Sequence, residues 1–222
     1  EEEAFEQIGD IAGYFLVHDR PIHMRTDDSV VRVAGREVYP YPIRRSRGYA
    51  PAPLGVAESF RQHILACGGE LKNTFCVAKE RHVFLSHHIG DLENYETLRS
   101  FREGVEHYCR LFDVRPELVA YDLHPEYLST KYALELEEAG LPAVGVQHHH
   151  AHVAACLADN ERPSEERVIG VALDGTGYGT DGAVWGGEFL EGSIREGFVR
   201  RAHLEYTPLP GGAAIREPWP LR

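Results

Sequence analysis

The chain has 222 residues, of which 43% are hydrophobic and 26% are charged, as is ordinary for a soluble globular protein. Its formal net charge of −12 argues against non-specific binding to nucleic acid or to an anionic membrane. No apolar run approaches the roughly 20 residues of a membrane-spanning helix, and no signal-peptide pattern opens the sequence. We therefore expect a cytoplasmic protein with no nucleic-acid partner and no membrane partner.

The four cysteines lie far apart in the sequence, at Cys67, Cys76, Cys109 and Cys156. No two of them form a Cys-x-x-Cys pair, so neither a disulfide framework nor a thiolate zinc site is expected. We predict reduced thiols that act as small apolar packing residues, in keeping with a reducing cytoplasm.

The first 55 residues are predicted to form one unit that is rich in β-structure. Strands are expected at 13–18 and 28–33, with a hairpin turn at 34–36. The prolines of this part of the chain forbid long helices. The proline-rich segment 51–55 is a stiff linker candidate. We therefore divide the chain into domains at 1–55 and 56–222.

From about residue 60, strand and helix patterns alternate. Apolar runs bounded by turn residues indicate strands, and apolar residues spaced three or four apart indicate helices. The expected elements are a strand ending in the turn at 67–69, strands at 73–78 and 82–87, a helix at 91–112, a strand at 118–122, a helix at 126–139, a strand at 143–146, a helix at 148–159 and a strand from 168 to 174. This order predicts a mixed α/β domain.

Four histidines stand close together in the run Gln147-His148-His149-His150-Ala151-His152. On a helix, His148 and His152 share one face and supply half of a site for a divalent metal. The following strand is expected to deliver Asp174 at its end. We predict that His148, His152 and Asp174 bind a divalent metal such as zinc or iron. His149 and His150 are expected to point away from that face, although His149 would replace His148 if the helix began later. An ordinary histidine patch is the plainer alternative.

Two glycine-rich turns are candidates for binding phosphate. In the run that follows Asp174, the missing side chains let backbone N–H groups approach phosphate oxygens. The turn at 67–74 adds a lysine that would neutralise phosphate charge. We predict that the hairpins at 67–78 and 173–186 face each other across a cleft, although both would also serve as ordinary turns. The predicted nucleotide-binding residues are Lys72, Asn73, Gly175, Thr176, Gly177 and Gly179.

Further polar side chains lie at strand ends. Asp122 and His124 follow the strand at 118–122, where α/β sites gather, although Asp122 would serve equally to fix the next helix. His87 and His88 end another strand. A charged set near the start would hold an acyl-adenylate or form a solvated strand face, and its members are Asp27, Asp28, Ser29, Arg32, Arg45 and Arg47.

Several segments together resemble the HypF carbamoyltransferases, which serve NiFe-hydrogenase maturation. The matching segments are 25–32 and 43–53, which are similar to the end of its YrdC-like domain, and 65–77, 121–131, 147–160 and 173–189. The resemblance implies an α/β fold: the end of a YrdC-like domain, then the first part of a TsaD-like domain of the actin/Hsp70 ATPase type. The chain would then be a fragment of a longer enzyme. The loop at 209–214 lacks the aspartate that the family leads us to expect there.

The family implies a reaction cascade. Carbamate from carbamoyl phosphate is coupled to ATP as carbamoyl adenylate, and the carbamoyl group then moves to the C-terminal cysteine of HypE. Dehydration there supplies the cyanide ligands of the hydrogenase iron. By resemblance the metal ligands are His148, His152 and Asp174. Residues near the adenylate would be Ser29, Arg32 and Arg45, and ATP would bind with Mg²⁺.

Three other functions fit parts of the same pattern. The His-x-x-x-His motif is shared with TsaD-type enzymes and with antibiotic O-carbamoyltransferases, so a small hydroxyl acceptor is one alternative. A non-catalytic fragment that binds nucleotide or the HypE tail is another. A sugar kinase of the same fold is the third, and it would show ATPase activity stimulated by a sugar.

Overall fold

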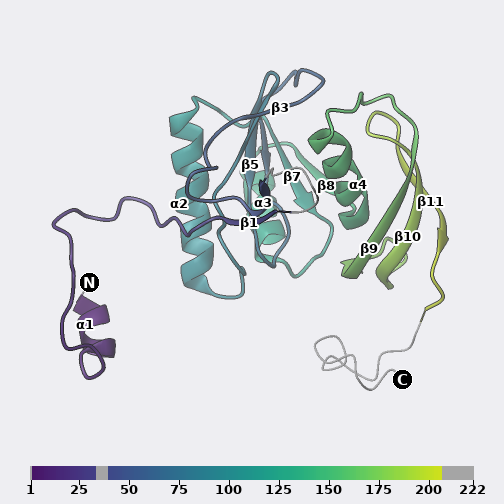
Figure 1. Cartoon of the computed structure of the whole chain (residues 1–222). Helices are drawn as coiled ribbons and strands as arrows, with labels where there is room; N and C mark the ends of the chain where they lie inside the picture. Colours follow the sequence, from purple (N-terminus) through teal and green to yellow (C-terminus); the bar gives the residue numbers. More distant parts are fainter. Residues whose placement is uncertain (1, 34–39, 207–222) are drawn as a thin grey trace.

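The computed structural model describes residues 2–33 and 40–206, and it shows a mixed α/β chain with three sheets. The described sheets have two, six and three strands, in chain order from the N-terminal part. Helix α4, His148–Asp159, lies between the six-stranded and the three-stranded sheets (Figure 1). The predicted mixed α/β class is thereby confirmed. The turn predicted at 34–36 and the loop at 209–214 lie outside the described residues.

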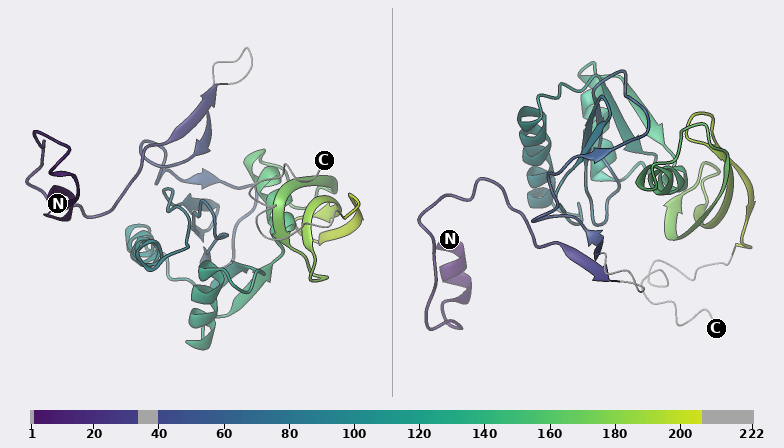
Figure 2. Two further views of the ribbon diagram at one scale, coloured as in Figure 1. Left: turned by 90° about the horizontal axis from the view of Figure 1, so that it is seen from below. Right: turned by 45° about the horizontal axis from the view of Figure 1, so that its top comes forward.

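The N-terminal part consists of a short helix and a hairpin. Helix α1 spans Glu2–Ile8, and strand β1, Val30–Val33, pairs antiparallel with β2, Pro40–Arg44. Helix α1 and the segment after it extend away from the larger sheets (Figure 2). The strand predicted at 28–33 is confirmed as β1.

The strand predicted at 13–18 is wrong. This segment forms no regular structure, and its Tyr14 and Leu16 are 97% and 103% exposed. A run of β-prone residues becomes a strand only where a neighbour supplies ladder hydrogen bonds and side-chain packing. No described strand lies beside this segment to supply them.

The six-stranded sheet is mixed, with strand order β3-β6-β5-β4-β7-β8. Its strands are β3 (Leu54–Gly55), β4 (Ile64–Ala66), β5 (Cys76–Lys79), β6 (His82–Leu85), β7 (Leu118–Asp122) and β8 (Ala143–Val146). The connecting helices are α2, Tyr95–Leu111, and α3, Leu128–Glu138. Every element predicted between residues 64 and 159 is present, with ends that differ by a few residues.

Strands β4, β7 and β8 run parallel, so their carboxyl ends meet at one edge of the sheet. Asp122 ends β7 and is paired in register with Val146, which ends β8. Only Gln147 separates β8 from the first residue of α4. Functional side chains of α/β proteins gather at this edge, and here it carries the first histidine of the predicted metal site.

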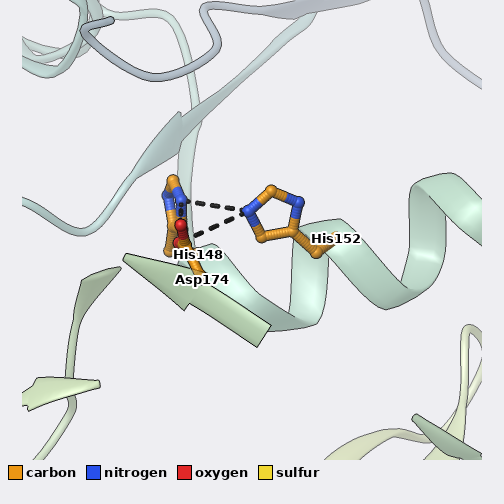
Figure 3. A group of neighbouring side chains, drawn as sticks. All are labelled: His148, His152 and Asp174. Carbon is orange, nitrogen blue, oxygen red and sulfur yellow. Dashed lines mark hydrogen bonds and ion pairs between the residues drawn. The ribbon is translucent and has the colours of Figure 1, made fainter. Parts of the chain in front are cut away.

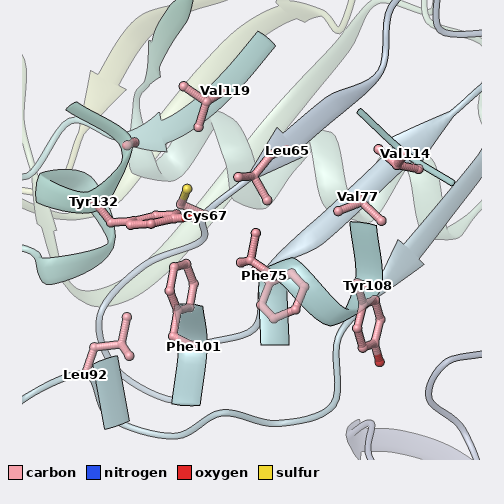
Figure 4. Close-up of a cluster of buried hydrophobic side chains, with 12 residues drawn as sticks. Leu65, Cys67, Phe75, Val77, Leu92, Phe101, Tyr108, Val114, Val119 and Tyr132 are labelled. Atoms are coloured by element: carbon pink, nitrogen blue, oxygen red, sulfur yellow. The ribbon is translucent and has the colours of Figure 1, made fainter. Parts of the chain in front are cut away.

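A core of aromatic and aliphatic side chains fixes α2 against this sheet (Figure 4). Phe75, next to β5, packs edge-to-face against Phe101 at 5.6 Å and against Tyr108 at 5.1 Å between ring centroids. Phe101 also contacts Tyr132 of α3 at 5.3 Å. Edge-to-face pairs are a favourable geometry for buried aromatic rings. The site therefore rests on a rigid, well-packed sheet.

The N-terminus of α2 carries a side-chain cap whose loss should be measurable. Asn94 Oδ1 accepts the backbone N–H of Thr97 at 2.9 Å. We expect Asn94→Ala to lower the free energy of unfolding by about 1 kcal/mol, because that N–H loses its partner. Urea unfolding measures the difference. Asn94→Asp keeps an accepting oxygen and should stay close to wild type; an equal loss in both variants would contradict the cap.

The three-stranded sheet packs on α4. Its strands are β9 (Val168–Tyr178), β10 (Val184–Ser193) and β11 (Gly197–His203), all antiparallel. Val153 and Leu157 of α4 form a small buried cluster with Leu190 of β10. No helix within the described ranges is long and apolar enough to cross a membrane.

Candidate metal centre

The glutamine before the four-histidine run sets where α4 begins. Gln147 Oε1 accepts the backbone N–H groups of His149 at 2.7 Å and His150 at 3.0 Å. Both N–H groups belong to the first turn, which has no intrahelical partners for them. The cap starts the helix at His148, which confirms the helix predicted at 148–159 and fixes His148 and His152 one turn apart.

The structure brings the three predicted metal ligands together (Figure 3). His148 Nε2 lies 3.0 Å and His152 Nε2 lies 3.5 Å from Asp174 Oδ2, and the two histidine nitrogens are 3.2 Å apart. Four-coordinate zinc with bonds of about 2.0–2.1 Å separates neighbouring ligand atoms by about 3.3–3.4 Å. The triangle of ligand atoms therefore already has the size that such a cation requires.

Asp174 reaches α4 because β9 is irregular at that residue. The pairs Leu173↔Gly187 and Gly177↔Trp185 enclose three residues on β9 but only Gly186 on β10. A bulge of this kind bends a strand and re-aims its side chains. A Cβ on Gly186 would come within 2.7 Å of the Asp174 carbonyl oxygen, so only glycine fits opposite the bulge.

This bulge corrects one prediction. We expected the strand to end at Asp174 and to be followed by a glycine-rich turn, but β9 continues through Tyr178. The glycine-rich segment is therefore mostly strand, and the reversal of the chain lies between Tyr178 and Val184. Pairing with β10 extends the strand, because glycine tolerates the bulged backbone.

The donor set fits a divalent metal. Asp174 Oδ2 is buried and has no hydrogen-bond partner among the described residues, although three imidazole nitrogens surround it. A buried acceptor without a partner is costly unless it binds something. Two imidazoles and one carboxylate are the ligands that zinc or iron(II) accepts, and three protein ligands leave a position for substrate.

A second carboxylate orients the first histidine. Asp122 Oδ2 lies 2.6 Å from His148 Nδ1, and Asp122 Oδ1 accepts the backbone N–H of His124 at 2.9 Å. The hydrogen bond to Asp122 is the main cause that raises the pKa of His148. With Nδ1 held by Asp122, Nε2 of His148 is turned toward Asp174, as in the carboxylate–histidine–metal arrangement of many proteins. The position of Asp122 at a strand end was the sequence signal for this role.

Removing this carboxylate should weaken metal binding without removing a ligand. We expect Asp122→Ala to lower the affinity for Zn²⁺ by about 10–100-fold, since His148 loses its orienting partner. Asp122→Asn keeps an accepting oxygen, so its Zn²⁺ affinity should lie between that of the wild type and that of Asp122→Ala. Competition with a chromogenic chelator measures the affinity. Glu117→Gln, which perturbs a side-chain contact to the backbone of His63, is the control. An Asp122→Ala affinity equal to that of the control would refute the orienting role.

The two predicted glycine turns have different relations to this centre. Gly177 and Gly179 are buried, and a Cβ on either would collide with the ring of His149 or of Trp185. Gly175 is exposed with open space around it, and Thr176 is half-buried. The assignment of these four residues to nucleotide binding stays a prediction, which the open space around Gly175 favours.

The turn at 67–74 lies against the metal centre. A Cβ on Gly69 would stand 3.9 Å from His148 Cε1 and 4.0 Å from the Tyr127 ring. Asn73 is buried, and its amide donates to the carbonyl groups of Cys67 and Gly69. Its side chain therefore holds the shape of the turn, while Lys72 next to it is exposed.

The residues predicted near an adenylate hold the N-terminal hairpin. Ser29 Oγ accepts the N–H of Ser46 and donates to the carbonyl of Arg47, both at 2.8 Å. Arg45 donates to the Tyr49 carbonyl at 3.4 Å, and Arg32 is exposed on β1. Within the described ranges, no hydrogen bond or ion pair connects these three residues to His148, His152 or Asp174. His87 and His88 also lie elsewhere, in a 560 Å³ cavity beside α2.

His149 is not one of the three clustered ligands, but it lies closer to them than the sequence indicated. Its ring is fully buried, and its Nε2 lies 3.7 Å from Asp174 Oδ2. Burial lowers the pKa of His149. A helical projection places its ring on a different face from His148, and only the position of β9 over that face could have revealed the contact.

Comparison with known proteins places this site in a family. Residues 59–159 match the HypF Kae1-like domain, and residues 170–221 match the second subdomain of the carbamoyltransferase Kae1-like domain. Carbamoyltransferase HypF2 of Cupriavidus necator is 49% identical over 223 residues, covering 98% of this chain and 27% of its own length. Carbamoyltransferase HypF of Synechocystis sp. is 44% identical, covering 97% of this chain and 27% of its own length.

Solved structures agree with this relation. A full-length HypF crystal structure in the phosphate- and nucleotide-bound form superposes with a TM-score of 0.85 at 50% identity, covering 94% of this chain and 32% of that one. The crystal structure of T. kodakarensis HypF superposes with a TM-score of 0.83 at 42% identity, and the match covers 96% of this chain and 27% of that one. The chain thus spans about a quarter to a third of these relatives. The chain belongs to the HypF carbamoyltransferase family, and it corresponds to the part of these proteins that includes the Kae1-like domain.

Proposed function

We propose that this chain is the carbamoyl-transfer part of an enzyme that carbamoylates the C-terminal cysteine of HypE for cyanide synthesis. The enzyme would form carbamoyl adenylate from carbamoyl phosphate and ATP and then transfer the carbamoyl group. The observation that carries the proposal is the trio of His148, His152 and Asp174, with its buried carboxylate oxygen lacking a hydrogen-bond partner, in a chain of the HypF family.

We propose the domain division on the same basis. Residues 1–55 would end a YrdC-like domain, and residues 56–222 would begin a TsaD-like domain of the actin/Hsp70 ATPase type. The β1–β2 hairpin forms a sheet of its own, which supports the first assignment. The family match that begins at residue 59 supports the second. Strand β3, Leu54–Gly55, lies at the boundary and pairs with β6.

The transfer step balances as an acyl substitution. The acceptor thiolate attacks the carbamoyl carbon, the bond from that carbon to the adenylate oxygen breaks, and AMP leaves with the electron pair. The proton of the thiol goes to solvent. A divalent metal held by His148, His152 and Asp174 would supply Lewis-acid polarisation of the carbamoyl group.

The chain's own side chains have separate tasks in this step. Asp122 orients His148, and Lys72 with the backbone at Gly175 and Thr176 would bind the nucleotide phosphates. Two cysteines of the six-stranded sheet region, the buried Cys67 and the half-buried Cys76, are unsuited to accept the carbamoyl group, because desolvation raises the pKa of Cys67 to about 12 and that of Cys76 to about 11. Cys109 is half-buried and Cys156 is exposed, but we assign the reacting thiolate to the partner protein, as the family relation implies. A reducing cytoplasm remains our prediction for the compartment.

Mass spectrometry of an acceptor peptide tests the proposal. A peptide of the HypE C-terminus, incubated with the full-length parent enzyme, ATP and carbamoyl phosphate, should gain one carbamoyl group on its cysteine. A panel of small alcohols in the same reaction tests the O-carbamoyltransferase alternative. Carbamoylation of an alcohol, with none of the cysteine, would overturn the proposal. HypE binding without any modification would favour the docking alternative.

A further inference from the structure

Two buried polar atoms lie close together beside the candidate metal centre, and neither makes an aligned hydrogen bond among the described residues, although one of them, Asp174 Oδ2, also lies 3.0 Å from His148 Nε2. They are Nε2 of His149 and Oδ2 of Asp174, which stand 3.7 Å apart. Orphaned buried polar groups are rare and call for an explanation. The question is whether His149 offers Asp174 a proton or offers a metal a lone pair.

The amide of Gln147 decides which ring nitrogen of His149 carries the proton. Gln147 Oε1 accepts two backbone N–H groups, those of His149 and His150. Backbone N–H groups only donate, so this atom is the oxygen and the amide cannot be flipped. The other end is therefore the nitrogen, which donates to the Tyr178 carbonyl at 3.1 Å and lies 3.2 Å from His149 Nδ1.

An amide nitrogen has no lone pair to offer, so His149 Nδ1 must be the acceptor in this contact. A neutral imidazole with an accepting Nδ1 carries its proton on Nε2. That N–H group belongs to the nitrogen that lies 3.7 Å from Asp174 Oδ2. A direct metal bond through Nε2 would require the proton on Nδ1. Two hydrogen-bond donors, this N–H group and the amide N–H of Gln147, would then face each other, which is unfavourable.

The ring has no room to turn away from this arrangement. His149 is fully buried, and its ring centroid lies 5.8 Å from that of Trp185. A Cβ on Gly177 would come within 3.0 Å of both ring nitrogens, so the β9 backbone closes the opposite side. The position of the ring is therefore set by helix, strand and tryptophan together.

We propose that His149 is a positioning residue for Asp174. Its Nε2–H donates to Oδ2 and holds the carboxylate in place, while its imidazole stays outside the set of metal ligands. A carboxylate oxygen has two lone pairs, so Oδ2 can accept this proton and still ligate. A small rotation of the carboxylate brings the present 3.7 Å into hydrogen-bond range. This role rests on the proposed metal site, but the position of the His149 proton on Nε2 can be tested separately.

Nitrogen-15 NMR tests that statement directly on the metal-free 222-residue chain. A long-range ¹H–¹⁵N correlation spectrum distinguishes the two neutral tautomers, and the His149 signal is assigned by its absence in His149→Gln. The expected result is an Nε2–H tautomer. An Nδ1–H tautomer overturns the proposal.

Titration with Co²⁺ tests the consequence for the metal. His149→Phe should still bind one equivalent, with an affinity about 10–100-fold lower and an unshifted visible absorption spectrum. His149→Gln, which keeps an N–H donor near the same place, should recover most of the affinity. Unchanged affinity in His149→Phe, or a shifted spectrum at saturation, overturns the proposal.

A second variant keeps the test decisive if His149→Phe does not fold. Gln147→Glu still caps the helix, but its second oxygen should accept from Nδ1 and so reverse the tautomer. Co²⁺ affinity should fall here too, and an unchanged affinity overturns the proposal. A wild-type chain that binds no Co²⁺ overturns the proposed metal site and this inference with it. Tight binding with an Nδ1–H tautomer overturns the inference alone.

Discussion

Replacing both His148 and His152 with alanine should abolish metal binding by this chain and carbamoyl transfer by the full-length parent. The two imidazoles are two of the three ligand atoms that lie within 4.8 Å of one another. A single remaining carboxylate, Asp174, cannot hold zinc or iron(II) against water and buffer. Inductively coupled plasma analysis after dialysis should show about one equivalent in the wild type and none in the variant.

His150→Ala is the matched control for this experiment. His150 is on the same helix, but its ring packs against Phe198 at 5.7 Å and takes no part in the trio. This variant should keep one equivalent of metal. Undiminished metal content and transfer in the double variant would remove the basis of the proposed function.

Glu188→Ala should be among the most destabilising single changes in the three-stranded sheet. Glu188 is 1% exposed, its Oε1 accepts the N–H groups of Gly186 and Gly187, and its Oε2 accepts Arg200 Nε. Removing one partner of a buried ion pair costs about 3–5 kcal/mol. Arg200 retains Asp181 at 3.1 Å, so we expect the lower end, about 3 kcal/mol, in urea unfolding.

The same change should weaken metal binding, because Glu188 holds the backbone directly opposite the bulge that carries Asp174. Glu191→Ala is the control: Glu191 lies on the same strand, but its ion pairs with Arg167 and Arg201 are exposed, and such pairs contribute less than about 1 kcal/mol. Equal losses of stability in the two variants would show that Glu188 behaves as a surface residue. Glu188→Gln removes the charge but keeps an oxygen that can accept the N–H groups of Gly186 and Gly187. The difference in unfolding free energy between Glu188→Gln and Glu188→Ala therefore measures the contribution of that acceptor.

Local spacing explains which parts of the site could be predicted. The pair His148/His152 and the limits of α4 depend on helical repeat and on one capping residue. Asp174 could be anticipated because an apolar run, 168–173, ends just before it, although this run alternates between exposed and buried side chains in the structure. The central strands and helices were recognisable for the same reason, since their apolar periodicity is visible within each segment.

Long-range pairing explains what was missed or wrong. Residues 13–18 have the composition of a strand, but no described strand pairs with them. Strand β9 continues past Asp174 because β10 pairs with it across a bulge. The orienting role of Asp122 depends on the register of β7 with β8, which places it beside α4. The glycines at 177 and 179 looked like a phosphate turn, yet they also make room for His149 and Trp185.

The proposed metal site depends on short-range order: two imidazoles one turn apart, a capping residue before them and a carboxylate after an apolar run. What surrounds that trio could be decided only when distant segments packed together. Asp122 lies at the end of β7 and contacts His148 of α4. The bulge at Asp174 depends on the pairing of β9 with β10, and His149 is buried because β9 packs against α4. Helical spacing is fixed by backbone geometry within a few residues, whereas sheet register and side-chain burial depend on partners that no local window contains.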